Sequence, residues 1–506
     1  MENNITNQAA PLDIPDIPTA APIEKRRYST FESLAALVCL PLGFMFTHLV
    51  FTHPGSIWGG LFWMLIGALL AVFTLARKTP VKPFQILLFA VAEIFCLVPL
   101  FSSSIGINVL AAMFSFGLIF YLAVTLSGAD VLGKHFVRDF FSGLYVKPFT
   151  RFGECPKALF SLVHRAKGGK TLLFILLGLL LALPITPIIL HLLISSDRMF
   201  ADALEGFMSS LPEFSRSTFF ELIFAIPIAF YLCGMLFRSA EKNAPRPDTL
   251  PTYRVFPLAV SCAAVTPVCV FYIAYILVQL NYLAAAFGGA LPEQYSYAEF
   301  ARSGFFELCT IAFINLCLIV LIQTFTARKQ NDSRPALLKI YTVILSGCTL
   351  LLIASAMSRM LLYISEYGMT GLRVMTSWFM ILLAVIFVVI ILWQFVKLPL
   401  WKVLFAAFTV LFGILCFGNT DGMIARYNVN AYLSGQHKEL DWYTLEKLGP
   451  PAAEYIITLG EEFSDKKDTY FERTYKRYCE DYPLPDYFSI YRVNADNVAE
   501  EYRNEH

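Results

Sequence analysis

Charge is scarce in this 506-residue sequence. Only 15% of its residues are charged and 57% are hydrophobic, with a mean hydropathy of +0.61, whereas about 25% of a typical soluble chain is charged. This composition excludes an ordinary soluble domain as the main body. The formal net charge of +1 gives no global basic field, so it also argues against a nucleic-acid partner.

Enzyme motifs are missing as well. The chain contains no G-x-x-x-x-G-K-[ST], H-E-x-x-H or G-x-S-x-G sequence and no paired C-x-x-C. Of its 11 cysteines, all but Cys155 and Cys479 fall inside long apolar runs, where cysteine packs as a small apolar residue. We therefore predict no catalytic residue, cofactor, metal site or disulfide framework. Whether the protein is an enzyme stays open, with a non-enzyme favoured.

Long apolar runs are what the sequence has in abundance. A membrane-spanning helix needs about 17–25 apolar residues, and lipid requires every backbone polar group to be satisfied within the protein. We therefore predict an all-α fold, a polytopic transmembrane helix bundle with a small C-terminal helical extramembrane domain. The eleven predicted spans are 31–51, 57–76, 84–101, 105–126, 171–195, 218–238, 255–279, 304–326, 336–357, 374–397 and 400–418.

Polar segments divide the chain around these spans. The expected parts are a disordered cytoplasmic tail (1–30), four spans (31–126), an interfacial loop (127–170), seven spans (171–418) and a helical acidic domain (419–506). The loop interleaves aromatic and basic residues, which favours helices lying on an anionic bilayer surface. The acidic domain has 17 acidic residues against 10 basic ones. Its turn residues predict helices over 421–434 and 442–448, with Pro450-Pro451 opening the next.

Basic residues predict the orientation. With the N-terminus inside, the inside segments hold 24 lysines and arginines, the outside loops hold 5, and the C-terminal region holds the remaining 10 of 39. This asymmetry favours a cytoplasmic N-terminus. Eleven spans then place the C-terminus outside.

Two similar stretches, RSTFFEL (216–222) and RSGFFEL (302–308), predict an internal duplication. Thr186-Pro187 and Thr266-Pro267 precede them in the same register, as do two Leu-Pro-Glu triplets. Residues 183–238 and 263–326 therefore read as two parallel copies of one unit. Arg373 suggests a third, decayed copy.

Each copy places an arginine and a glutamate at the start of a span. The simpler interpretation is helix capping: Thr218 and Gly304 are the N-caps, and Glu221 and Glu307 stand in the first turn. The alternative is that Arg216, Glu221, Arg302 and Glu307 line an externally facing mouth.

Deeper polar residues are further candidates. Asn315 and Gln323 lie eight residues apart on one span, where hydrogen bonding across packed helices is more typical than substrate binding. Glu93 lies in the middle of the third span, where an ionised carboxylate is costly. We expect Glu93 to face polar side chains of other spans, away from lipid, and to be partly protonated at neutral pH.

The stretch GNTDGMIARYNVNAYLSGQHKELDWYTLEKL resembles the closing segment of a family of bacterial polytopic proteins classed as a domain of unknown function, numbers 4153 and 4173. The motif Y-x-x-x-A-R-x-G-F-x-E-L of that family is matched from Tyr297 to Leu308, and the stretch from Tyr367 to Arg373 resembles its Y-G-L-T-x-x-R motif, with Met369 in place of the leucine. The resemblance covers roughly residues 170–460 and implies a bacterial cytoplasmic membrane. It adds Arg426 and Asn428 to the candidate residues, and it assigns no reaction.

Two functions are consistent with these patterns. One is a carrier or permease, favoured by the many spans, the repeat and the buried acids. The alternative is a membrane-anchored signalling or envelope-assembly protein whose C-terminal domain binds a protein partner.

The predicted topology can be tested by fusing a reporter after His506. Eleven spans and an inside N-terminus require an alkaline phosphatase fusion to be active, because that enzyme folds only outside the cytoplasm. A fluorescent protein that matures only in the cytoplasm should stay dark at the same position. The opposite pattern would mean that span 84–101 or span 400–418 does not cross.

Overall fold

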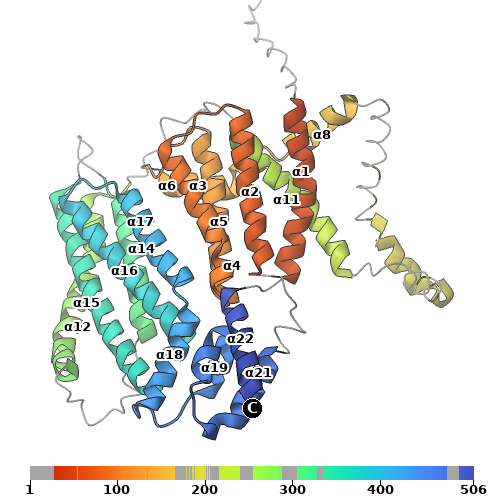
Figure 1. Cartoon of the computed structure of the whole chain (residues 1–506). Coiled ribbons are helices and arrows are strands. Elements are labelled where there is room, and N and C mark those ends of the chain that lie inside the picture. The colour runs from red at the N-terminus through yellow and green to blue at the C-terminus, as the bar shows by residue number, and fades with distance from the viewer. Residues whose placement is uncertain are drawn as a thin grey trace, which may run out of the picture.

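The computed structural model describes most of the chain and shows it to be helical (Figure 1). Every named element in this part of the chain is a helix, which confirms the predicted all-α class. The described residues are 28–53, 55–133, 135–165, part of 178–204, 216–239, 255–287, 305–327, 334–475 and 489–505.

Nine helices in the described residues are long and apolar enough to cross a membrane. They coincide with nine of the eleven predicted spans, which makes the chain a multi-pass membrane protein. These helices are α1 (Thr30–Thr52), α2 (Ile57–Ala76), α5 (Ile105–Leu126), α11 (Arg216–Ser239), α12 (Leu258–Phe287), α14 (Phe305–Phe325), α15 (Ala336–Tyr367), α16 (Gly371–Phe395) and α17 (Leu400–Phe417).

The predicted span 84–101 forms two helices, α3 (Pro83–Cys96) and α4 (Val98–Phe101). Pro99 lacks a backbone N–H and stands in the first turn of α4, which accounts for the break at Leu97. Residues 83–101 together extend about 28 Å at 1.5 Å per residue, close to the ~30 Å hydrocarbon thickness of a bilayer. The predicted span 171–195 lies mostly outside the described residues.

Basic residues gather at the end of the bundle where α1 begins. Arg77 after α2 forms an ion pair with Glu32 of α1, with Nη2 2.6 Å from Oε1. The ammonium group of Lys402 on α17 lies 5.2 Å from the ring centroid of Phe84 on α3. We call this end the basic face. The C-terminal domain lies at the opposite end (Figure 1).

The loop predicted to be interfacial forms three short helices at the basic face. They are α6 (Phe136–Tyr145), α7 (Lys147–Thr150) and α8 (Glu154–Arg165), and they pack on α5, α11 and α1 respectively. The hydroxyl of Tyr28 donates a 2.8 Å hydrogen bond to Glu154, which fixes α8 to the chain just before α1.

The membrane helices form two bundles (Figure 1). One contains α1, α2, α3, α5 and α11, and the other contains α12, α14, α15 and α16. Small residues allow close packing in the first bundle, because a side chain at Gly43 of α1 would collide with the carbonyl oxygen of Ala225 and with Ala229 on α11. Such contacts between small residues are typical of membrane helices, where van der Waals packing drives association.

Helix α17 joins the two bundles through aromatic side chains. The ring of Phe412 stacks on Phe95 of α3 at 5.3 Å and lies 5.5 Å from Phe114 of α5. On its other side Phe412 lies 5.9 Å from Trp378 of α16. The indole N–H of Trp378 donates to the carbonyl oxygen of Leu411 at 2.9 Å. This aromatic cluster therefore belongs to both bundles at once.

The C-terminal domain confirms the helix boundaries predicted from its turn residues. Asp441 caps α19 by accepting a 3.1 Å hydrogen bond from the Thr444 amide. Gly435 and Gly449 follow α18 and α19 with φ of +75° and +64°, a region that favours glycine. The elements are α18 (Thr420–Leu433), α19 (Trp442–Leu448), η1 (Pro450–Ala452), α20 (Ala453–Ile456), η2 (Glu461–Phe463), α21 (Ser464–Tyr475) and α22 (Ile490–Glu505).

Replacing Gly43 with alanine should lower the stability of the protein, because the new methyl group must push α1 away from the α11 backbone. Gly59→Ala on α2 is the matched control, since nothing lies within 4 Å of its added Cβ. Alanine gains about 1 kcal/mol over glycine in a helix, so this control should hold or raise the thermal midpoint in detergent. Equal midpoints for both variants would show that the α1–α11 contact is not tight.

Candidate binding groove

Asn428 ties helix α18 to the loop between α15 and α16. Its Oδ1 accepts a 2.7 Å hydrogen bond from the Met369 amide, and its Nδ2 donates to the Met369 carbonyl oxygen at 2.8 Å. The approach is close because Gly368 has no side chain: a Cβ there would lie 2.8 Å from Oδ1 of Asn428. One amide thus satisfies both backbone groups of a loop residue.

Arg373 hydrogen-bonds to the same loop, between α15 and α16. Its guanidinium donates to the carbonyl oxygens of Tyr367, at 3.0 Å, and Gly368, and it lies 4.0 Å from the ring centroid of Tyr363. Two candidate residues predicted from separate stretches, Arg373 and Asn428, therefore converge on one loop. Both side chains hydrogen-bond to backbone groups of residues 367–369, so their role is to hold this loop in place beside the C-terminal domain.

A sharp corner joins α17 to α18 beside this loop. Asn419 adopts a left-handed conformation, with φ of +47°, and its side chain accepts a 3.0 Å hydrogen bond from the Gly422 amide. Asp421, in the first turn of α18, lines a narrow crevice with Ser102 and Ser103 from the turn before α5. Burial raises the pKa of Asp421 to about 6, because a carboxylate is poorly solvated there.

A groove of about 440 Å³ opens at this corner, between Asn419, η1, α20 and α22. Three asparagine amides, a glutamate and a tyrosine give it polar edges, and proline, isoleucine and valine give it apolar surface. Its lining residues are Asn419, Pro450, Pro451, Glu454, Ile490, Tyr491, Val493, Asn494 and Asn497.

The polar edge of the groove is organised around Glu454. The amide of Asn494 donates a hydrogen bond to its carboxylate. Burial raises the pKa of Tyr491, and the charge of Glu454 adds to that rise. Among the described residues the groove lining contains a carboxylate and no lysine or arginine, so the charge of this part of the groove suits a neutral or cationic ligand.

The deep amides of the second bundle connect helices. Asn315 of α14 is fully buried; its Oδ1 accepts from the Tyr272 hydroxyl at 2.8 Å and its Nδ2 donates to Thr349 at 2.9 Å. Gln323 donates to Thr342 of α15 at 2.9 Å. The prediction that these amides bond across packed helices is confirmed.

The capping interpretation is wrong for Glu221. Helix α11 begins at Arg216, two residues before Thr218, so Thr218 is not the N-cap. Glu221 is instead buried, with Oε2 3.1 Å from Nδ1 of His48 on α1. Its pairing partner lies 173 residues away in sequence, and no local pattern identifies such a partner.

The second copy behaves differently from the first. Helix α14 begins at Phe305 and Glu307 stands in its first turn, as predicted, where its side chain is exposed. The side chain of Arg216 and all of Arg302 lie outside the described residues. The repeated sequence therefore does not give the two glutamates the same surroundings.

Glu93 faces the neighbouring helix, as expected, but without the expected polar side chains around both oxygens. Its carboxyl group packs where Gly67 of α2 leaves space, and a Cβ at Gly67 would collide with Oε1. Within the described part of the chain, Oε1 is buried and accepts no hydrogen bond. The remaining candidate, Arg426 on α18, is exposed.

Sequence reasoning missed several residues of the C-terminal domain and of the basic face. Glu454, Tyr491 and Asn494 carry no motif, and only folding brings α20 and α22 together. The pair of Ser29 and Glu32 had a recognisable signal, because S-x-x-E before an apolar run is a capping box. In the structure Ser29 and Glu32 exchange hydrogen bonds of 3.1 and 2.7 Å at the start of α1.

The sequence model of the family described as "Domain of unknown function (DUF4153)" matches residues 86–459. The match begins earlier in the chain than the resemblance noted from motifs, and it includes Glu93, the corner at Asn419 and the loop clamp of Asn428. It ends before α22, so one wall of the groove lies beyond it. No curated protein and no solved structure matches the chain.

Asp421 should make stability depend on pH. Because its folded pKa is raised from 3.8 to about 6, the folded chain holds a proton that the unfolded chain releases between those values. Stability is therefore lost as the pH rises through this window. Asp421→Asn should remove that loss and stabilise the protein at pH 7.5, by at most about 3 kcal/mol for a shift of this size.

The measurement is the thermal midpoint of the purified protein in detergent from pH 4 to pH 7.5. Asp465→Asn, at an exposed position on α21, is the control and should follow the wild-type curve. A wild-type curve that Asp421→Asn leaves unchanged in shape would show that Asp421 is well solvated.

Proposed function

Because the chain belongs to the DUF4153 family, whose description assigns no activity, we propose a function from its geometry: a membrane-anchored protein whose C-terminal domain binds an extended segment of a partner protein. The groove between Asn419, η1, α20 and α22 is the observation that carries this proposal. The membrane helices serve as the anchor, and the groove supplies the recognition.

The groove chemistry suits a peptide. Asn419, Asn494 and Asn497 carry side-chain amides. Asn419 accepts one hydrogen bond and Asn494 donates one within the protein, and their remaining donors and acceptors can pair with the N–H and C=O groups of an extended backbone. Ile490 and Val493, which are 48% and 42% exposed, supply apolar contact for the side chains of the segment. These features fit an extended peptide segment that pairs through its backbone and carries apolar side chains.

Charge favours a basic segment. The C-terminal region carries a formal net charge of −7, from 17 acidic and 10 basic residues. Glu454 is exposed at the groove, in position to pair with a lysine or arginine of the partner. Complementary charge of this kind sets specificity and speeds association.

The place of the groove favours signalling or assembly over passive anchoring. Asn419 lines the groove and also caps α18 directly after the membrane helix α17. A segment bound at Asn419 therefore contacts the residue that sets the angle between the membrane helix and the extramembrane domain.

The carrier hypothesis is the second candidate, favoured by the buried Oε1 of Glu93. It ranks second because Asn315 and Gln323, the polar residues expected to line a substrate path, hydrogen-bond neighbouring helices. Neither amide is exposed to a cavity among those described.

Site-specific photo-crosslinking in cells tests the proposed groove. A photoreactive phenylalanine analogue replaces Val493, which lines the groove and is 42% exposed. We expect one discrete protein adduct, and we expect Glu454→Lys to reduce its yield severalfold because the charge at the groove is reversed. Synthetic peptides from the adducted region should bind the purified protein, and lose binding when their basic residues are replaced.

Tyr443 on α19 provides the matched control position, since it is 65% exposed and does not line the groove. The same analogue there should not give the adduct. An adduct formed equally at both positions, or one that Glu454→Lys leaves unchanged, would refute the groove as the binding site.

A further inference from the structure

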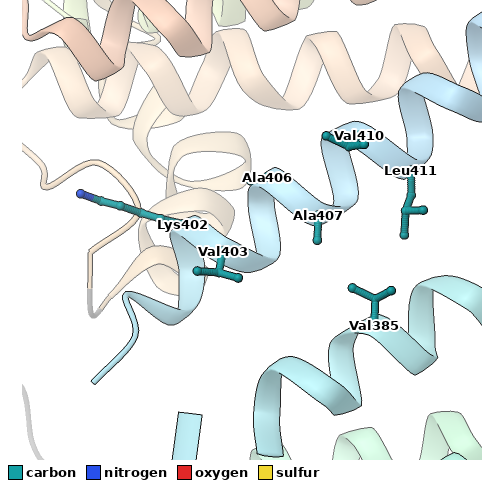
Figure 2. A pocket seen from close by; sticks show the side chains of 7 residues that line it. All are labelled: Val385, Lys402, Val403, Ala406, Ala407, Val410 and Leu411. Atoms are coloured by element: carbon teal, nitrogen blue, oxygen red, sulfur yellow. The ribbon is translucent and has the colours of Figure 1, made fainter. Parts of the chain in front are cut away.

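A second hollow lies between the membrane helices α16 and α17, away from the C-terminal domain. It is a shallow, open hollow of about 600 Å³, and all but one of its lining residues are apolar. Figure 2 shows Val385 of α16 opposite Ala407 of α17, with Lys402 at one end. The small side chains of Ala406 and Ala407 leave this space open along α17.

The length of the groove matches one leaflet of a bilayer. Its lining on α17 runs from Lys402 to Leu411, nine residue steps or about 14 Å of helix. The hydrocarbon core of a bilayer is about 30 Å thick, so one leaflet contributes about half of that. Val410 lies at the end of the groove toward the middle of the bilayer and is 60% exposed, as expected for a side chain that contacts an acyl chain.

The end of the groove at the membrane surface is positively charged. Lys402 belongs to the basic face, where its ammonium group lies 5.2 Å from the ring centroid of Phe84 at the start of α3. The two turns at this end, 77–83 and 396–402, contain five basic residues and no acidic residue; Arg77 is paired with Glu32, and the other four give a surplus of positive charge. This surplus suits a phosphate group at the membrane surface.

We propose that the groove binds an anionic phospholipid, with one acyl chain between α16 and α17 and the phosphate at Lys402. A second copy of the protein is the competing occupant. Both copies would have the same orientation in the membrane, so their basic faces would meet and repel each other. The charge at Lys402 therefore favours a lipid.

Native mass spectrometry of the full-length protein in detergent tests this site, with phosphatidylglycerol and phosphatidylcholine as the added lipids. The wild type should retain phosphatidylglycerol preferentially. Lys402→Gln should reduce this preference about fivefold, the usual contribution of one lysine near an anionic surface. Ala407→Phe should fill the groove and abolish retention of both lipids.

Two controls separate the groove from general lipid contact. Lys339→Gln removes a basic residue of α15, and Val320→Phe enlarges an apolar side chain that is 52% exposed on α14. Both should bind lipid as the wild type does. Retention that neither Lys402→Gln nor Ala407→Phe reduces, or a dimer that Ala407→Phe dissociates, would overturn the proposal.

Discussion

The aromatic cluster around Phe412 is the contact on which the arrangement of the molecule depends. Phe412 touches Phe95 of one bundle and Trp378 of the other, so α17 is held by both. The same helix leads into the corner at Asn419, and α18 continues from there to the clamp of Asn428 on the Met369 loop. The position of the C-terminal domain is therefore set by the aromatic contacts of α17 together with the Asn428 clamp outside the membrane helices.

Much of the membrane part follows from the sequence, because length and hydropathy report directly on helices that cross a bilayer. Nine predicted spans coincide with described helices, and Asp441 and Gly449 marked the ends of α19 correctly. Pro99 divided a predicted span in two. Which helices pack together was not predictable, because two apolar faces of similar composition carry no label for their partner.

The candidate site was predictable only where local chemistry decides the outcome. Asn315 bonds neighbouring helices because a buried amide in an apolar bundle must find a partner. Glu221 departs from the predicted capping role because its carboxylate contacts a distant histidine, His48, once α1 packs on α11. The groove at Glu454 depends on the meeting of three elements, and no spacing along the chain encodes that meeting.

The ion pair between Glu32 and Arg77 has a consequence for biogenesis. It links the first turn of α1 to the residue that follows α2, so it forms only when both helices have entered the membrane and folded back on each other. A basic residue after a membrane helix favours the cytoplasmic side, and in the folded protein Arg77 also holds α2 to α1 through this ion pair. The ion pair is therefore present only after α1 and α2 have formed the first helical hairpin.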